Sequence, residues 1–184
     1  MSLKNTEHRY GSLSIKMHWL MFILIAATYA FIEFRVLFEK GTEMRDLFKM
    51  WHFMLGLTVL FMVVIRLYFR FTQVTPKITP PPSAMQDKAA KGAHFLLYVL
   101  MIAMPIAGWV MLSAFGKPIP FFGLELPPLI GKDKDLGKSI EEIHELVGTI
   151  GYFLIGLHAL AAIIHHHVQK DDTLTRMLPE RCDK

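Results

Sequence analysis

The sequence predicts an all-α integral membrane protein, a bundle of four transmembrane helices. Hydrophobic residues make up 53% of the 184 residues. They gather in four long blocks, residues 15–34, 47–69, 89–115 and 141–167. A helix needs about 20 mostly apolar residues to cross the hydrocarbon core of a bilayer, and each block has this length. The helices of a soluble bundle would instead show a polar stripe, which these blocks largely lack. We expect residues 1–184 to form a single transmembrane domain.

The first block follows the basic residues Lys4, Arg9 and Lys16, so it also resembles the start of a signal peptide. Two features argue against cleavage. The apolar stretch is longer than the usual signal core of about 7–15 residues, and no small-residue cleavage site follows it. We therefore expect the first block to be a transmembrane helix.

Basic residues are divided unequally between the two sides that four spans would create. The side with both termini carries 12 Lys and Arg residues, and the other side carries 8. Acidic residues show the opposite distribution, with 6 Asp and Glu residues on the side of the termini and 10 on the other side. Because cytoplasmic loops are enriched in Lys and Arg, we expect both termini in the cytoplasm. This topology accounts for the formal net charge of +4, so the charge does not indicate nucleic-acid binding.

The connections between the blocks differ in character. Prolines at 76 and 80–82 predict a stiff, extended segment after the second block. The longest connection, residues 116–139, contains an apolar stretch at 121–128 that is too short to span. We expect this stretch to lie along the outer membrane surface and cap the bundle. The single cysteine, Cys182, excludes a disulfide within the chain.

The chain has nine histidines, and several lie inside the apolar blocks. An imidazole at membrane depth is costly and marks a functional site; a metal or haem iron offsets this cost. His144 and His158 are 14 residues apart in the fourth block. On a helix this separation keeps two side chains within about 40° of each other and about 21 Å apart along the axis. The spacing predicts two sites at different depths, with Gly148 and Gly151 leaving room for a flat macrocycle.

Each site needs a second ligand from another helix. His18 lies near the start of the first block, at the depth of His158, and His52 lies near the start of the second, at the depth of His144. Gly56, one turn after His52, gives clearance. The sequence thus predicts two histidine pairs. Zinc prefers four ligands around one point, whereas two imidazoles at each of two depths suit haem iron.

Four residues near the inner pair allow two interpretations each. His165 follows His158 on the same helix face, and His94 starts the third block at a similar depth. These two histidines either line a quinone site or face lipid headgroups. Arg66 and Arg70 either bind haem propionates through bidentate contacts or anchor the helix at the membrane surface. Three histidines are expected in solvent or at the interface: His8, His166 and His167.

Five stretches of the chain resemble one known family. They are SIKMHWL at 14–20, RLYFR at 66–70, AHFLLY at 93–98, GYFLIGLH at 151–158, and HH at 165–166 followed by KDDTL at 170–174. In their order and spacing, over nearly the whole chain, the sequence resembles the bacterial cytochrome b561 family, which includes superoxide oxidase-like di-haem membrane cytochromes b.

The resemblance implies two b haems in a multi-pass protein of the bacterial inner membrane. It assigns His18 and His158 to the cytoplasmic haem, and His52 and His144 to the periplasmic haem, as iron ligands. It also implies electron delivery to ubiquinone. In superoxide oxidases the electron comes from periplasmic superoxide, an anion that local positive charge attracts. Three residues would supply such charge here: Arg45, Lys49 and Lys138.

Two alternatives remain open at this point. Other members of the broader family are cytochrome subunits that accept electrons from a partner dehydrogenase or another redox protein. A structural or transport membrane protein without haem is the third possibility, and an absorption spectrum of the purified protein would separate it from the other two.

Overall fold

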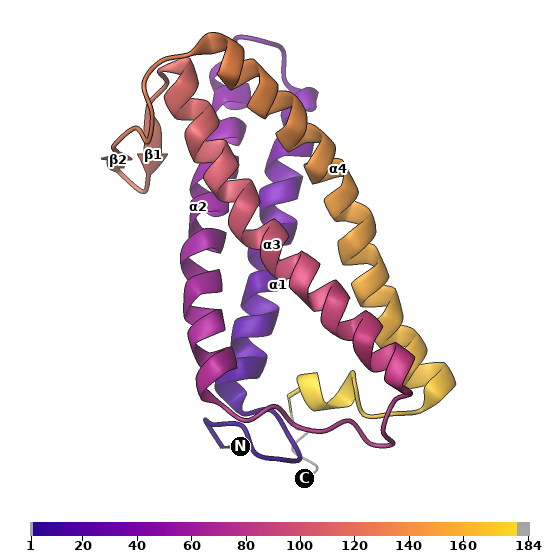
Figure 1. Cartoon of the computed structure of the whole chain (residues 1–184). Coiled ribbons are helices and arrows are strands. Elements are labelled where there is room, and N and C mark those ends of the chain that lie inside the picture. The colour runs from indigo at the N-terminus through magenta and orange to yellow at the C-terminus, as the bar shows by residue number, and fades with distance from the viewer. Residues whose placement is uncertain (1, 180–184) are drawn as a thin grey trace. The chain divides into compact units, whose positions relative to one another are not determined.

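The computed structural model describes residues 2–179, and Cys182 lies outside them. Four long helices make up most of the described chain (Figure 1). They are α1 (Ser12–Phe34), α2 (Glu43–Thr72), α3 (Ala84–Phe115) and α4 (Lys134–Ile164). All four are long and apolar enough to cross a membrane. The expectation of a mainly helical chain with four apolar helices of membrane-spanning length is therefore confirmed.

Five short elements complete the described chain. Two of them are 3₁₀ turns, η1 (Arg35–Leu37) and η3 (Thr175–Met177). A π-helical turn, η2 (His165–Gln169), continues α4. The other two are the strands β1 (Ile119–Phe121) and β2 (Leu124–Leu126).

Helices α2, α3 and α4 begin earlier than their apolar blocks suggest, because polar residues cap them. Ser83 and Gln86 form a reciprocal capping box before α3: the Gln86 N–H donates to Ser83 Oγ at 3.3 Å, and the Ser83 N–H donates to Gln86 Oε1 at 2.9 Å. The side chain of Asp133 accepts the Leu136 N–H at the start of α4. Hydropathy alone marks the apolar part of a helix and misses such polar first turns.

The contacts within the chain divide it into two compact units, and every long helix contributes to both. Unit 1 consists of the described parts of Met1–Leu20, Val64–Tyr98 and Tyr152–Lys184. Unit 2 consists of Met21–Val63 and Val99–Gly151. Each unit is described separately below.

In unit 1, three segments outside the long helices are joined by backbone hydrogen bonds. The Lys77 N–H, in the connection between α2 and α3, donates to the Glu7 carbonyl at 3.2 Å. The Asp172 N–H, after α4, donates to the Thr79 carbonyl at 3.1 Å. The connection therefore lies between the N-terminal segment and the segment that follows α4.

In unit 2, the long connection after α3 forms a β-hairpin, which the sequence analysis did not predict. Strands β1 and β2 pair antiparallel, with Ile119 opposite Leu126. Phe122 and Gly123 form the turn with φ values of 47° and 86°. Positive φ at both turn residues matches the twist of a two-residue hairpin. The stretch at 121–128 is therefore partly a hairpin.

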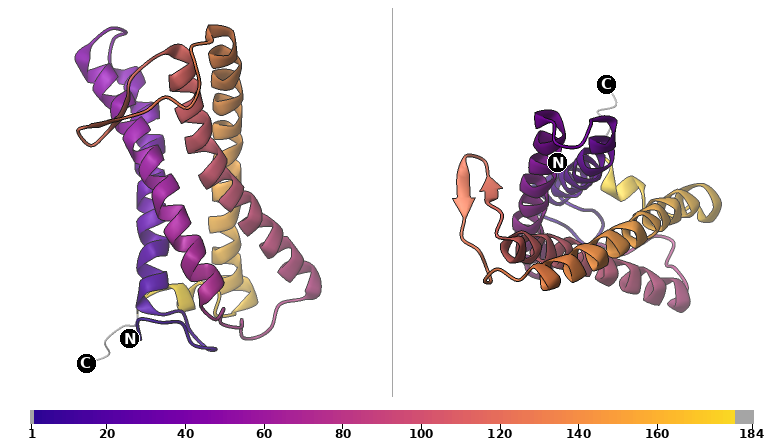
Figure 2. Two further views of the ribbon diagram at one scale, coloured as in Figure 1. Left: turned by 60° about the vertical axis from the view of Figure 1, so that its left-hand side comes forward. Right: turned by 90° about the horizontal axis from the view of Figure 1, so that it is seen from above.

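The hairpin packs against α2 and α3, and Figure 2 shows it beside α2. Ile119 is buried in a cluster with Leu57 and Leu112. The indole N–H of Trp109 on α3 donates to the Pro127 carbonyl at 3.0 Å, just after β2. Burial of one hairpin face against the helices accounts for the fold of these short strands.

Helix α4 lies close to α1 in unit 2 at two glycines. The Tyr29 hydroxyl on α1 donates to the Gly148 carbonyl at 2.9 Å. A Cβ atom at Gly151 would collide with the same hydroxyl and would lie 3.2 Å from a methyl carbon of Leu100. The space at Gly151 is taken by protein side chains, so its assignment to a macrocycle is wrong. At Gly56, by contrast, an added Cβ would meet no atom within 4 Å.

This close approach predicts that Gly151→Ala destabilises the protein. The new methyl group displaces Tyr29 and breaks its hydrogen bond to Gly148, at a cost of about 1 kcal/mol, which lowers Tm by about 2–4 °C. Thermal unfolding in detergent measures this change. Gly156→Ala on the same helix is the control, because its Cβ would enter open space, and Ala has the higher helix propensity. Equal Tm values for the two variants would contradict the prediction.

Candidate functional site

Unit 1 brings His18 and His158 together, the predicted inner pair. His18 lies on α1 and His158 on α4, with ring centroids 6.2 Å apart and ring planes at 63°. Two imidazoles on opposite sides of one metal ion, with metal–nitrogen bonds of about 2 Å, place their ring centres about 6 Å apart. Both rings are half-buried. The spacing fits two ligands of one iron.

Unit 2 brings together the predicted outer pair, His52 on α2 and His144 on α4. Their ring centroids are 6.3 Å apart, with planes at 79°. His52 Nδ1 lies 2.9 Å from the Thr28 carbonyl oxygen. Because a carbonyl only accepts hydrogen bonds, Nδ1 carries the proton and Nε2 of the neutral ring is left as a lone-pair donor. Metal-binding histidines commonly donate their second ring N–H to a carbonyl in this way.

The ring of His144, the other member of the pair, differs from that of His52 in its contacts. Its Nδ1 atom is buried and has no hydrogen-bond partner among the described residues. A buried polar atom without a partner costs about 1–3 kcal/mol, and each such atom in a native structure calls for an explanation, such as strain, a catalytic role, or a bound water or ion. Gly108 on α3 lies against this ring, since a Cβ there would be 3.5 Å from His144 Cε1.

The two arginines predicted near the inner pair have different surroundings in unit 1. Arg66 Nη2 lies 3.2 Å from His18 Nδ1. The guanidinium has only donors, so it donates and the ring nitrogen accepts. Arg70 is exposed and its guanidinium donates to the Thr75 hydroxyl. Arg66 therefore contacts the inner pair directly, whereas Arg70 contacts the connection that follows α2.

His94 and His165, the predicted quinone-site residues, also have different partners in unit 1. The His94 ring centroid lies 5.5 Å from that of His158. His165 Nδ1 lies 2.5 Å from Asp171 Oδ2. Asp171 was missed by the sequence analysis. The sequence does place the carboxylate of Asp171 six residues after His165. On a regular helix this separation would not bring the two side chains together, and only the bend after α4 does so.

Two of the three basic residues expected to attract an anion, Arg45 and Lys49, bind neighbouring groups in unit 2. Arg45 donates to the carbonyl oxygens of Phe38 at 2.8 Å and Arg35 at 3.4 Å. Lys49 forms an ion pair with Asp46 at 2.8 Å. The carboxylate of Asp46 thus offsets the charge of Lys49 and also attracts that of Arg45.

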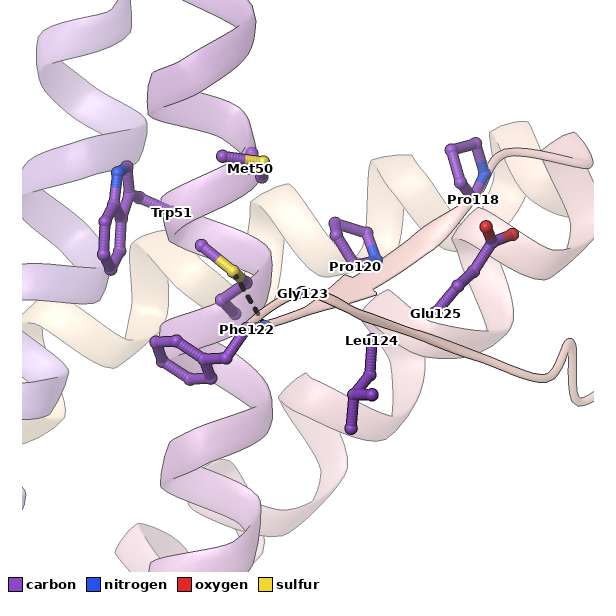
Figure 3. A pocket seen from close by; sticks show the side chains of 9 residues that line it. Met50, Trp51, Pro118, Pro120, Phe122, Gly123, Leu124 and Glu125 are labelled. Atoms are coloured by element: carbon purple, nitrogen blue, oxygen red, sulfur yellow. Dashed lines mark hydrogen bonds between the residues drawn. The ribbon is translucent and has the colours of Figure 1, made fainter.

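A groove of about 490 Å³ lies between α2 and the hairpin (Figure 3). Its floor includes Met54, whose sulfur accepts the Phe122 N–H at 3.3 Å. Apolar side chains line most of it, with Glu125 the one charged residue. None of its lining residues is a histidine, so the groove is separate from the outer pair. The lining is Met50, Trp51, Met54, Pro118, Pro120, Phe122, Gly123, Leu124 and Glu125.

Within residues 2–179, no group of three or more His, Cys, Asp or Glu side chains could hold a metal ion. The candidate centres in this range are the two histidine pairs. A two-imidazole donor set suits an iron whose remaining ligands come from a porphyrin.

Comparison with known proteins assigns the family. The family model described as prokaryotic cytochrome b561 matches residues 9–180. The chain belongs to the prokaryotic cytochrome b561 family. Its members are membrane cytochromes b that transfer electrons, and the four helices of membrane-spanning length agree with that. The family implies b-type haem, and the histidine pairs provide a fitting donor set.

Curated relatives within this family match along almost their whole length. Cytochrome b561 homolog 1 of Escherichia coli (strain K12) is 37% identical over 95% of this chain and 99% of its own. Probable superoxide oxidase CybB of Yersinia pestis is 36% identical over 94% of this chain and 97% of its own. Cytochrome b561 homolog 2 of Escherichia coli (strain K12) is 31% identical, over 97% and 95% respectively. The similarity supports a bacterial membrane protein with oxidoreductase character.

Proposed function

We propose that this member of the family is a superoxide:ubiquinone oxidoreductase that forms one di-haem domain in the bacterial inner membrane, with both termini cytoplasmic. The observation that carries the proposal is the pair of histidine spacings, 6.2 Å and 6.3 Å. His18 with His158 would hold the inner haem, and His52 with His144 the outer haem.

The haem would supply a one-electron carrier at each histidine pair. His18 with His158, and His52 with His144, would hold the iron through imidazole nitrogens. This arrangement is typical of electron transfer and not of oxygen binding. The Thr28 carbonyl fixes the tautomer of His52, and so keeps Nε2 unprotonated for the metal.

Superoxide is the proposed donor on the periplasmic side. Losing one electron converts it to dioxygen without proton transfer, so the chain needs no general acid or base there. Its contribution would be to attract a small anion, and Arg45, whose guanidinium donates to neutral carbonyl oxygens, is suited to that. The relative named probable superoxide oxidase, 36% identical to this chain, supports the assignment.

Ubiquinone is the proposed acceptor near the inner pair. Its reduction needs two electrons and two protons, so proton-carrying groups must lie close by. His94 and His165 are such groups in unit 1. The proposed role of both is to donate to the quinone carbonyls or to relay protons to them.

The contact between Arg66 and His18 bears on the proposed propionate role. An iron on His18 Nε2 requires the ring proton on Nδ1, and Arg66 then needs a different acceptor. A haem propionate would be such an acceptor, with the geometry that a guanidinium prefers. Arg70 is proposed to contribute to propionate binding by its charge.

This role predicts that Arg66→Gln lowers the midpoint potential of the inner haem. Reduction adds negative charge, and a nearby cation favours the reduced form, so its loss shifts the potential down by tens of millivolts, where about 59 mV is a tenfold change in the equilibrium constant. Spectroscopic redox titration measures the shift. Arg66→Lys keeps the charge and is the control. If Arg66 only anchors α2 at the membrane, the midpoint potential of the inner haem will stay unchanged in both the Arg66→Gln and the Arg66→Lys variants.

Stopped-flow spectroscopy with superoxide pulses tests the proposed function. Purified protein should show fast reduction of its haem bands, and added ubiquinone should then reoxidise them. Haem bands that superoxide leaves unchanged would overturn the proposal. They would favour the alternative, a cytochrome subunit that accepts electrons from a partner dehydrogenase or other redox protein.

A further inference from the structure

The segment after α4 contains a buried carboxylate that the proposed function does not yet use. Asp171 is 6% exposed, and it is the one buried charged residue within the described range. Burying an ionised carboxylate is costly unless hydrogen bonds and an opposite charge compensate it. The contacts of Asp171 therefore indicate why it is there.

Both carboxylate oxygens of Asp171 have partners in unit 1. Oδ2 lies 2.5 Å from His165 Nδ1, and Oδ1 accepts the Thr173 N–H at 2.9 Å. The His165 side chain is itself only 18% exposed. The pair is thus largely shielded from solvent, which strengthens its electrostatic interaction.

The backbone bends sharply to make this pair. Helix α4 ends in the π-helical turn η2, a form that is frequent at functional sites. Lys170 then adopts a left-handed conformation with φ of 56°, which is unfavourable for a residue other than glycine. The Asp171 N–H bonds back to the His165 carbonyl at 3.2 Å. A strained turn thus holds the carboxylate against the imidazole.

Burial raises the pKa of Asp171, but the hydrogen bonds from His165 and Thr173 outweigh it, and the pKa lies below its ordinary value. The carboxylate is therefore ionised at neutral pH. An ionised carboxylate only accepts hydrogen bonds, so His165 Nδ1 must carry a proton. Nε2 is then the ring atom that can exchange a proton with a substrate.

We propose that Asp171 is a positioning residue that holds the proton of His165 on Nδ1 and directs proton donation to the quinone through Nε2. This inference rests on the proposed reduction of ubiquinone. The quinone takes up two electrons, one from each of two superoxide anions that become dioxygen, and two protons. The His165 imidazolium gives one proton from Nε2 and returns to the neutral form protonated on Nδ1. It is then reprotonated from cytoplasmic water and gives the second proton in the same way. The imidazole and carboxylate are neither oxidised nor reduced.

The other charged groups of this segment have different contacts. Asp172 Oδ1 accepts the Thr79 N–H at 2.9 Å. Arg176 donates to the Pro76 carbonyl at 2.8 Å and lies 5.3 Å above the Tyr10 ring. Lys170 precedes Asp171 in the turn. Asp172 is thus an adjacent carboxylate with a structural contact, which makes Asp172→Asn a matched control for Asp171→Asn.

The kinetic test uses haem-loaded, full-length protein that has been reduced before mixing with a soluble short-chain ubiquinone. Asp171→Asn should slow haem reoxidation by about 10²-fold or more, the usual contribution of a general acid, and should change its pH dependence. Reduction by superoxide should stay at the wild-type rate. Asp172→Asn should remain within about twofold of wild type, and Asp171→Glu should restore part of the rate.

Nitrogen-15 NMR of labelled histidines gives a second readout that needs no variant of Asp171. The His165 signal, assigned with His165→Gln, should show the neutral ring protonated on Nδ1. A ring protonated on Nε2 would overturn the inference, as would equal quinone rates in Asp171→Asn and wild type. Wild-type protein that superoxide reduces but ubiquinone does not reoxidise would overturn the proposed function and this inference together.

Discussion

His158→Ala is expected to reduce the haem content from two haems to one per chain. His158 is one of the two imidazoles of the inner pair, 6.2 Å from His18 between ring centroids. With one of its two histidine ligands gone, the inner haem should be lost during purification. The outer pair in unit 2 is unchanged and should keep its haem. The measurement is the haem-to-protein ratio from the pyridine haemochrome spectrum.

Two controls identify the ligand. His165→Ala changes a nearby histidine on the same segment and should keep both haems. His94→Ala is the sharper comparison, because the His94 ring centroid lies 5.5 Å from that of His158. Loss of haem from His94→Ala, with full haem in His18→Ala, would mean that His94 and not His18 faces His158 across the iron. Two haems in His158→Ala would show that the inner pair does not hold a haem.

His144→Ala is expected to abolish electron entry from superoxide. The outer haem would be lost with this ligand, and the rate at which superoxide reduces the remaining haem should fall more than about 100-fold, comparable to the loss of a major catalytic group. Dithionite should still reduce the inner haem, because His18 and His158 are unchanged. Stopped-flow traces with the two reductants make the comparison.

Thr149→Ala is the matched control for that variant. Thr149 lies on the same helix, and its hydroxyl donates to the Glu145 carbonyl of its own helix at 3.0 Å. It should keep both haems and the wild-type rate with superoxide. If His144→Ala were reduced by superoxide as fast as Thr149→Ala, the electron would enter by another route.

The parts of the fold that could be predicted from the sequence are those set by local patterns. The apolar blocks located all four long helices, because spanning length and hydropathy are local properties. The depth of each histidine along its helix follows from a fixed rise per residue. This is why His18 could be matched with His158, and His52 with His144, before their ring distances were known.

The missed features depend on contacts that are distant in the sequence or on irregular backbone. The hairpin strands have only three residues each, and burial of Ile119 against α2 and α3 stabilises them. Gly151 was linked to a cofactor because its contact with Tyr29 depends on how α1 packs. Asp171 was missed because a left-handed Lys170 after a π-helical turn breaks the regular helical spacing from which side-chain positions can be predicted.

Electron paramagnetic resonance of the oxidised wild-type protein tests the two histidine pairs most directly. The ring planes cross at 63° in the inner pair and 79° in the outer pair. Iron between two such crossed imidazoles should be low-spin with strongly anisotropic signals, so two signals of that kind, together equal to two irons per chain, are predicted. A high-spin signal as the main species, or one low-spin iron per chain, would contradict the account.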